Sequence, residues 1–113
     1  MAILDYLELP VGSVGEQKDF YSAAFGWTFT DYGPDYAAHE GGPCQLGLNG
    51  TQQAPGYSAA ILPVIRVADI AAALDLVVAA GGVVTVDTFE FPGGKRFHFR
   101  DPEGRELACY EPG

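Results

Sequence analysis

Residues 99–112 read FRDPEGRELACYEP, and this stretch decides the fold because it joins the end of one strand to the start of another. Asp101 can hydrogen-bond the backbone two residues further on, Pro102 fixes φ at the second turn position, and Gly104 accepts a left-handed exit. Polar and apolar residues alternate after the turn, as in a half-buried strand. The sequence therefore predicts strands at Lys95–Arg100 and Glu106–Glu111 joined by a tight turn.

The length and composition indicate one globular domain. The chain has 113 residues, of which 48% are hydrophobic, and this is enough to bury a core. No apolar stretch approaches the ~20 residues of a membrane span, and no basic region followed by a hydrophobic segment opens the chain. We therefore expect a cytoplasmic protein with no membrane partner. Cys44 and Cys109 have no motif spacing, so we expect two free thiols.

The charge of the chain is strongly negative. Fifteen acidic residues face six basic ones, and the formal net charge is −9. Residues 1–56 carry seven acids and one base, a net charge of −6, and residues 57–113 carry eight acids and five bases, a net charge of −3. Binding of a nucleic-acid backbone needs a basic surface, so nucleic acid is excluded as a partner. The acidic surface either attracts cationic ligands or serves solubility alone.

The two halves of the chain match each other when one is shifted by 56 positions. The identical pairs are Val11 with Val67, Asp19 with Asp75, Ala23 and Ala24 with Ala79 and Ala80, Gly26 with Gly82, and Asp31 with Asp87. The register holds without a gap from residue 9 to residue 31. We infer two copies of one supersecondary unit, a first module over residues 1–56 and a second over residues 57–113.

Each module opens with a strand and a helix. The first strand is predicted over Ile3–Val11, and a capping box at Ser13 starts a helix that Gly26 ends. In the second module, a strand ending at Val67 precedes a helix that Asp69 caps. Gly81 and Gly82 stop this second helix.

Three short strands complete each module. They are predicted at Trp27–Tyr32, Asp35–Glu40 and Cys44–Asn49, and then at Val83–Thr88, Lys95–Arg100 and Glu106–Glu111. The predicted fold class is therefore α+β, with two tandem βαβββ modules. Each helix should pack on the face of its sheet that carries Leu9 in one module and Ile65 in the other. Cys109 is expected to be buried on that helix side, which leaves the opposite face of each sheet to line something else.

Two segments of the chain resemble the vicinal oxygen chelate superfamily, which includes glyoxalase I, bleomycin resistance proteins and extradiol dioxygenases. They are KDFYSAAFGW at residues 18–27 and RDPEGRELACYEP at residues 100–112, and the tandem modules extend the resemblance over essentially the whole chain. The resemblance implies a sheet curled around a cleft. In the metalloenzymes of the family, His, Glu or Gln side chains on the first and last strand of each module hold a divalent ion there.

The resemblance maps the four ligand positions onto Tyr6, Gly47, Leu62 and Ala108. None of these residues is a good ligand for a divalent ion. We therefore expect no metal and no cofactor. The alternative is a metal site rebuilt from other donors expected to face the cleft, which are Glu8, Gln45, Glu106, and the two histidines His39 and His98.

The cleft walls are the candidate binding site. By strand parity, with Trp27 added at the rim, the predicted ligand-binding residues are Tyr6, Glu8, Trp27, Arg66, His98, Glu106 and Tyr110. Aromatic faces with a few convergent charges suit a planar or cationic organic molecule. Glu8 is expected to lie outside the core, so that its replacement should hardly affect folding. The sequence thus favours a protein that binds a small organic molecule without a catalytic metal.

Two other functions stay open, and each can be told apart by what the protein binds. One is a lyase, isomerase or dioxygenase-like enzyme with a rebuilt metal site, or with acid–base residues such as Glu8 and His98. The other is a structural or regulatory dimer without a ligand. A homodimer is expected in every case, because open sheet edges are commonly covered by a twofold partner. The apolar segment Ala59–Val67 is the expected contributor.

Overall fold

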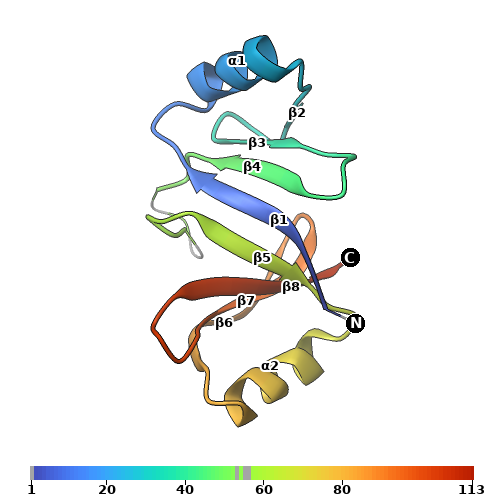
Figure 1. Cartoon of the computed structure of the whole chain (residues 1–113), viewed down its shortest axis with the longest axis vertical. Coiled ribbons are helices and arrows are strands. Elements are labelled where there is room, and N and C mark those ends of the chain that lie inside the picture. Colours follow the sequence, from blue (N-terminus) through green and yellow to red (C-terminus); the bar gives the residue numbers. More distant parts are fainter. Residues whose placement is uncertain (1, 53, 55–56) are drawn as a thin grey trace. The chain divides into compact units, whose positions relative to one another are not determined.

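The chain forms two compact units, each with one helix and its own strands. The computed structural model describes residues 2–52, 54 and 57–113. One unit, Tyr6–Ile61, is called here the N-terminal unit, and the other, Met1–Asp5 with Leu62–Gly113, the C-terminal unit. Residue 56, where the sequence places the module boundary, lies outside the described residues. The elements follow the order βαβββ twice (Figure 1), so the predicted α+β fold of two tandem modules is confirmed.

The N-terminal unit contains a small mixed sheet beside helix α1. Its elements are β1 (Ile3–Pro10, which starts in the other unit), α1 (Val14–Phe25), β2 (Thr30–Asp31), β3 (Tyr36–His39) and β4 (Gln45–Asn49). The strand order is β2-β3-β4-β1. Strand β1 runs parallel to β4, and the other pairs are antiparallel. The strand predicted over Trp27–Tyr32 is reduced to the two residues of β2.

The C-terminal unit repeats this arrangement, and its last three strands are longer than their counterparts. Its elements are β5 (Leu62–Arg66), α2 (Ile70–Ala79), β6 (Val83–Phe91), β7 (Gly94–Arg100) and β8 (Glu106–Pro112). The strand order is β5-β8-β7-β6, with β5 parallel to β8 and antiparallel pairing elsewhere. Neither described helix is long and apolar enough to cross a membrane.

The predicted helix boundaries are confirmed by their caps. The Ser13 side chain accepts a hydrogen bond from the Glu16 backbone N–H at 3.1 Å, and Gly26 ends α1 with a left-handed φ of 70°. The Asp69 side chain accepts from the Ala72 backbone N–H at 3.1 Å. Each cap satisfies a backbone donor that the first helical turn leaves without a partner.

The turn between β7 and β8 also forms as predicted. The Asp101 carboxylate accepts hydrogen bonds from the backbone N–H groups of Glu103 at 2.9 Å and Arg105 at 3.0 Å. Gly104 has a φ of 85°, a region that glycine enters without strain. The turn fixes the register of the β7–β8 hairpin, in which His98 pairs with Ala108.

The helix in each unit covers one face of the sheet and builds a small core there. In the N-terminal unit the core consists of Val11, Val14, Ala37 and Leu48, with Leu9, Tyr21, Phe29 and Leu46 packed against it. In the C-terminal unit it consists of Val67, Ile70, Phe97, Phe99 and Cys109, with Ile65, Ala73, Leu74, Val77 and Leu107 packed against it. The predicted positions of Leu9, Ile65 and buried Cys109 are therefore confirmed. Tyr6 and Glu8 lie on the opposite face of the N-terminal sheet, and His98 lies on the opposite face of the C-terminal sheet.

Candidate functional site

The face of the N-terminal sheet opposite α1 carries a hydrogen-bonded chain of two phenols and a carboxylate. The Tyr36 hydroxyl donates to Glu8 Oε2 at 2.9 Å, and the Tyr6 hydroxyl is hydrogen-bonded to the Tyr36 hydroxyl. A phenol has one proton to donate, so Tyr6 is the donor in its bond with Tyr36. The chain therefore runs in one direction, from Tyr6 through Tyr36 to Glu8.

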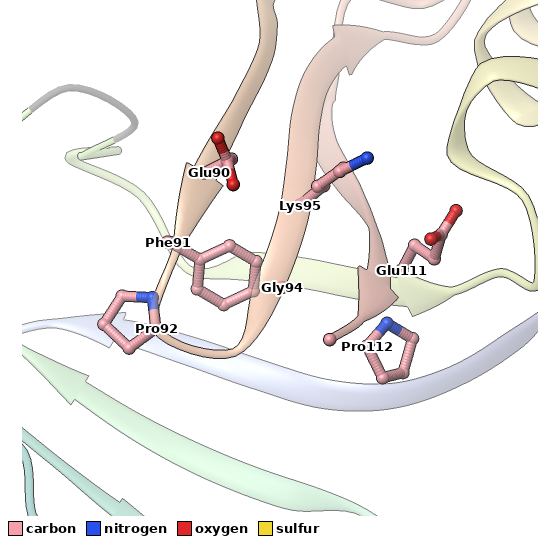
Figure 2. Close-up of a pocket in the computed structure, with 8 residues that line it drawn as sticks. Glu90, Phe91, Pro92, Gly94, Lys95, Glu111 and Pro112 are labelled. Atoms are coloured by element: carbon pink, nitrogen blue, oxygen red, sulfur yellow. The ribbon is translucent and has the colours of Figure 1, made fainter.

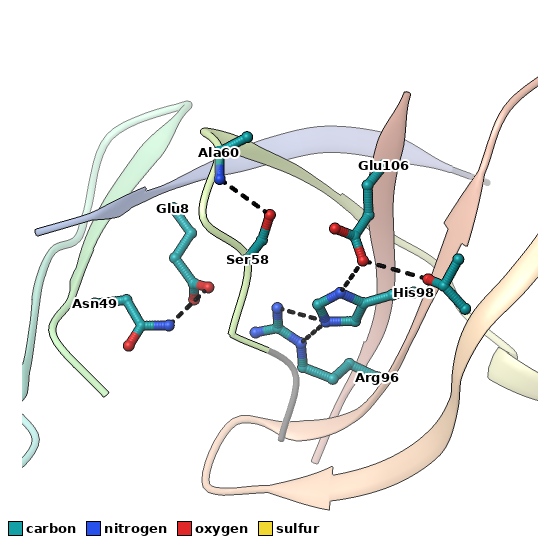
Figure 3. Close-up of polar contacts among 8 residues, drawn as sticks. Glu8, Asn49, Ser58, Ala60, Arg96, His98 and Glu106 are labelled. Carbon is teal, nitrogen blue, oxygen red and sulfur yellow. Dashed lines mark hydrogen bonds and ion pairs between the residues drawn. The ribbon is translucent and has the colours of Figure 1, made fainter. Parts of the chain in front are cut away.

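Asn49 holds the other oxygen of the same carboxylate. Its side-chain amide donates to Glu8 Oε1 at 3.1 Å, as Figure 3 shows, and its own carbonyl accepts from the Thr51 backbone N–H at 2.9 Å. Glu8 is only 3% exposed. The expectation that Glu8 lies outside the core is therefore wrong. A charge this deeply buried needs hydrogen bonds at both oxygens, and Tyr36 and Asn49 supply them.

The surroundings of Tyr36 keep it protonated. Burial raises the pKa of the Tyr36 phenol well above its usual range, and the negative charge of Glu8 raises it further. Tyr36 therefore keeps its proton at neutral pH and acts as a hydrogen-bond donor to Glu8.

Gly47 lies directly across from Glu8 in the β1–β4 pairing. A Cβ atom at position 47 would overlap the hydroxyl oxygens of both Tyr36 and Tyr6. The space that a side chain would need at this position is thus filled by the two phenols. No metal-binding side chain fits there unless the tyrosines move.

The C-terminal unit carries a second polar cluster, centred on His98. The side chain of His98 is fully buried, with 0% exposure. Arg96 donates to His98 Nε2 through its Nε atom at 3.2 Å and lies 3.0 Å from it through Nη2 (Figure 3). An arginine can only donate, so Nε2 is an acceptor and carries no proton. The imidazole is therefore neutral, with its proton on Nδ1.

The protonated Nδ1 atom of His98 points to Glu106. It donates to Glu106 Oε2 at 3.2 Å, and the Thr85 hydroxyl donates to the same oxygen at 3.3 Å. Arg96 is 8% exposed, and its guanidinium lies 5.9 Å from the ring centre of Phe89 and 5.6 Å from that of Phe91. Such cation–π contacts help to stabilise a buried guanidinium.

A third group of polar side chains joins the start of β1 to β8 within the C-terminal unit. The Tyr110 hydroxyl donates to the Asp5 carboxylate, at 3.0 Å from Oδ2. The Arg66 Nε atom lies 3.7 Å from the same oxygen, and the Arg66 side chain is about half exposed. Burial raises the pKa of Tyr110 to about 12, and the hydrogen bond to Asp5 adds to this effect. Tyr110 is thus a neutral donor and Arg66 an accessible cation.

The two ligand positions that the resemblance places in the C-terminal unit are apolar and enclosed. Leu62 is 1% exposed and Ala108 is 0% exposed, and Ala108 pairs with both Val64 and His98 across the sheet. Neither side chain offers a donor atom. Together with Gly47 and a phenol at position 6, these residues do not fit the divalent ion of the family's metalloenzymes. Within the described part of the chain, no three His, Cys, Asp or Glu side chains gather as a metal site would require.

Trp27 and His39 belong to an aromatic group on the helix side of the N-terminal sheet. Trp27 stacks on His39 with ring centres 4.6 Å apart and on Tyr21 of α1 at 5.9 Å. His39 is two residues from Ala37, which belongs to the core under α1, so both point to the helix side. The expectation that His39 faces the same side as Glu8 is therefore wrong. Trp27 belongs to this helix-side aromatic group, away from Tyr6 and Glu8.

The structure adds residues that the sequence reasoning missed. Tyr36, Asn49, Asp5 and Arg96 each hold one of the predicted site residues in place. Strand parity would have indicated Tyr36, because it lies an even number of positions from Ala38, which pairs with Gly47. The same alternation would have indicated Arg96, which lies two residues before His98 on β7, whereas Asn49 and Asp5 contact residues far away in the sequence.

A separate pocket of about 260 Å³ lies at the turn between β6 and β7. Figure 2 shows Phe91, Glu90, Lys95 and Glu111 among the residues that line it. The Glu111 carboxylate also accepts from the Ile70 backbone N–H at 2.9 Å and so caps α2. The volume is below the range of about 300–1,000 Å³ that is usual for small-molecule sites. The predicted site residues do not line this pocket.

The chain belongs to the Glyoxalase/Bleomycin resistance protein/Dioxygenase superfamily, because the model of this family matches residues 3–108. This confirms the resemblance inferred from the two sequence segments. No curated protein matches the chain as a relative.

Solved structures share the fold at low sequence identity. A methylmalonyl-CoA epimerase from Mycobacterium tuberculosis has a TM-score of 0.79 at 14% identity, covering 97% of this chain and 87% of its own. An NAD-dependent benzaldehyde dehydrogenase from Legionella pneumophila has a TM-score of 0.79 at 12% identity, covering 96% and 98%. A superfamily member from Vibrio splendidus has a TM-score of 0.66 at 14% identity, covering 100% and 98%. Identities this low show the fold alone.

Proposed function

We propose that the protein binds a small organic molecule, planar or cationic, without a catalytic metal. The single observation that carries this proposal is at Gly47, where Tyr6 and Tyr36 fill the space of a ligand side chain. Leu62 and Ala108 support it, since both are buried and neither has a donor atom. The residues at these four positions therefore offer no ligands for the divalent metal of the family's metalloenzymes.

Buried polar residues beside these positions support binding of a ligand with polar groups. Glu8 pairs with Gly47 in the N-terminal unit, and His98 pairs with Ala108 in the C-terminal unit. Burying such groups costs free energy, and proteins commonly bear this cost at functional sites. Within the N-terminal unit we propose Tyr6 and Glu8 as ligand contacts. Within the C-terminal unit, taken by itself, we propose Arg66, His98, Glu106 and Tyr110. Trp27, in the helix-side group, is left out of this set.

A second candidate is a metal-free acid–base enzyme, and the chain from Tyr6 through Tyr36 to Glu8 favours it. Such a chain can pass a proton from a half-buried phenol to a buried carboxylate. His98 is a poor base by comparison, because Arg96 already donates to its unprotonated nitrogen. Turnover of a bound ligand that stops in Tyr6→Phe, while binding continues, would favour the enzyme over the binding protein.

The proposal includes a homodimer in the cytoplasm. Two free thiols, exposed Cys44 and buried Cys109, are typical of a reducing compartment and support the location. The dimer is proposed because sheet edges and exposed apolar side chains favour self-association. Only the exposed residues of the segment Ala59–Val67 can contribute to a dimer interface, since Leu62, Val64 and Val67 are buried.

A thermal-shift screen tests the binding function directly. The probes are small aromatic cations, their neutral isosteres, and Mn²⁺, Fe²⁺, Ni²⁺ and Zn²⁺ added alone. We expect an organic probe to raise the melting temperature and the metal ions to leave it unchanged, because stabilisation follows occupancy of the folded state. Elemental analysis of protein purified without chelator should find no stoichiometric metal. Near one equivalent of a divalent metal, or stabilisation by a metal ion alone, would overturn the proposal.

A variant pair then tests the site. Glu8→Gln should weaken binding of a cationic probe about 10- to 100-fold if the carboxylate is shielded from water. Glu103→Gln is the matched control, because Glu103 is exposed and its side chain pairs with exposed Arg105 at 3.4 Å. Binding is compared at a temperature at which circular dichroism shows both variants folded. Equal affinity in the two variants would remove Glu8 from the site.

A further inference from the structure

Asn49 is the only asparagine in the sequence, and it is followed by Gly50. The Asn49 side-chain amide donates to Glu8 Oε1 at 3.1 Å (Figure 3), and Asn49 is buried. A Cβ atom at position 50 would lie 3.2 Å from Val14 Cγ2 and 3.4 Å from the carbonyl oxygen of Asp35, so the packing there favours glycine. The hydrogen bonding of Glu8 and the packing at the end of β4 together place an asparagine directly before a glycine.

An asparagine before a glycine is chemically labile, because a glycine has no side chain to shield its backbone nitrogen. The Gly50 nitrogen loses its proton and bonds to Cγ of Asn49, which closes an imide ring and releases the side-chain nitrogen as ammonia. Water then opens the ring to aspartate or to its isomer, in which the main chain runs through the side-chain carbon. The net reaction converts an amide and water into a carboxylate and ammonium, so water is the only co-reactant.

The folded N-terminal unit keeps the reacting groups apart. The Gly50 backbone N–H donates to the carbonyl oxygen of Asp35 at 2.8 Å. Asn49 pairs with Pro10 of β1 on one side and with Tyr36 of β3 on the other, so its backbone is held extended. Ring closure requires the Gly50 nitrogen to rotate onto the Asn49 side chain. A strand paired on both sides does not allow this rotation, so the reaction requires the strands to separate first.

The product of the reaction does not fit the native structure. Conversion of Asn49 to aspartate removes the donor to Glu8 Oε1 and places two carboxylates within hydrogen-bond distance. Both positions are buried, where like charges are costly. The isomer lengthens the main chain at a residue that pairs with two strands. A chain that has reacted while unfolded therefore cannot rebuild the contact with Glu8.

We propose that Asn49 is a deamidation site that the native fold protects and that unfolding opens, and that its modification makes unfolding irreversible. The inference goes beyond the proposed function and does not depend on the identity of the ligand. Its consequence for function is that deamidation disrupts Glu8, a proposed ligand contact. The lifetime of the native protein at alkaline pH is then set by how often the N-terminal unit opens.

Peptide mass spectrometry of protein incubated at pH 8 tests the protection. Deamidation of Asn49 should be at least tenfold slower in the native protein than in guanidinium chloride, because only the open state reacts. The native sample contains sodium chloride at the same ionic strength. Gly50→Ala in guanidinium chloride is the control for the chemistry, and it should slow the reaction by shielding the attacking nitrogen. Equal rates in the native and unfolded wild-type chain would overturn the protection, and an unchanged rate in unfolded Gly50→Ala would overturn the ring closure.

Two variants test the effect of the product on the fold. Asn49→Asp should unfold at a lower guanidinium concentration than the wild type at pH 8, because two carboxylates then face each other. Adding Glu8→Gln to this variant should raise the midpoint again, because the amide and the carboxylate have then exchanged places. Circular dichroism measures both midpoints. An Asn49→Asp protein as stable as the wild type, or a double variant no more stable than Asn49→Asp, would overturn the irreversible step.

Discussion

The hydroxyl group of Tyr36 occupies the space that a side chain at position 47 would need. Gly47 has no left-handed backbone angle, so this contact, rather than the conformation of the chain, requires a glycine there. Tyr6 contributes its hydroxyl to the same space. The glycine at position 47 is therefore required by the hydrogen-bonded chain that runs from Tyr6 through Tyr36 to Glu8.

Replacing Gly47 tests this relationship. Gly47→Ala should lower the free energy of unfolding by about 1–3 kcal/mol, because the added methyl group overpacks the contact with the two phenols. Gly15→Ala is the control, since no atom lies within 4 Å of the added methyl group and the site is in helix α1. It should raise the free energy of unfolding by up to about 1 kcal/mol. Urea denaturation measures both, and equal effects would contradict the packing argument.

The buried carboxylate gives a second prediction. Glu8→Gln should lower the free energy of unfolding by about 1–3 kcal/mol, because one oxygen becomes an amide that faces a donor from Tyr36 or Asn49. Asp19→Asn, an exposed change on α1, should alter it by no more than about 0.5 kcal/mol. Chemical denaturation of the two variants side by side provides the comparison. Loss of stability in neither variant would mean that Glu8 is solvated in solution.

The state of His98 gives a third prediction. Nitrogen NMR near neutral pH should find the His98 proton on Nδ1 and none on Nε2, because Arg96 can only donate to Nε2. His39 serves as the reference in the same spectrum. In Arg96→Gln the guanidinium donor to Nε2 is lost, but Glu106 still accepts from Nδ1, so the proton on Nδ1 should remain there. A doubly protonated His98 in the wild-type protein would contradict the arrangement.

Much of the fold could be predicted because local signals specify it. The side chains of Ser13, Asp69 and Asp101 each accept hydrogen bonds from backbone groups within four residues, so short segments of sequence are enough to predict these roles. The alternation along the strands placed Leu9 and Cys109 on the helix side correctly. The 56-residue repeat then transferred each assignment from one module to the other.

The candidate site could be predicted only in part, because it depends on pairs far apart in the chain. Glu8 and Asn49 are 41 residues apart, and Tyr110 and Asp5 are 105 apart. Which carboxylate a phenol reaches depends on strand order and register, which sequence patterns do not specify. His39 was misplaced for a simpler reason. Its strand, β3, has only four residues, which are too few to show from the sequence which alternate positions face the helix.

The two cysteines give a prediction of reactivity. Cys44 is exposed, whereas Cys109 is 4% exposed and lies in the core under α2. Burial raises the pKa of the Cys109 thiol to about 11, so at pH 8 almost none of it is the reactive thiolate. A thiol reagent at pH 8 should therefore modify one equivalent per native chain and two per unfolded chain. Rapid modification of two equivalents in the native protein would show that the core opens readily.

The same thiol makes stability fall at alkaline pH. In the unfolded chain Cys109 ionises near its ordinary pKa of 9.0, whereas in the folded chain it keeps its proton up to about 11. Rising pH therefore favours the unfolded state over this interval. The stabilisation is complete below pH 9 and is lost progressively up to pH 11, by about 2–3 kcal/mol in total.

In Cys109→Ala this contribution is absent, so the stability difference between wild type and variant should shrink by that amount from pH 8 to pH 11. Cys44→Ala should follow the wild-type curve, because it keeps the buried thiol of Cys109. Both variants also keep the tyrosines, including Tyr110, so the alkaline titration of these groups is common to all three proteins. Urea denaturation at each pH measures the three curves, and a constant difference between wild type and Cys109→Ala would refute the assignment.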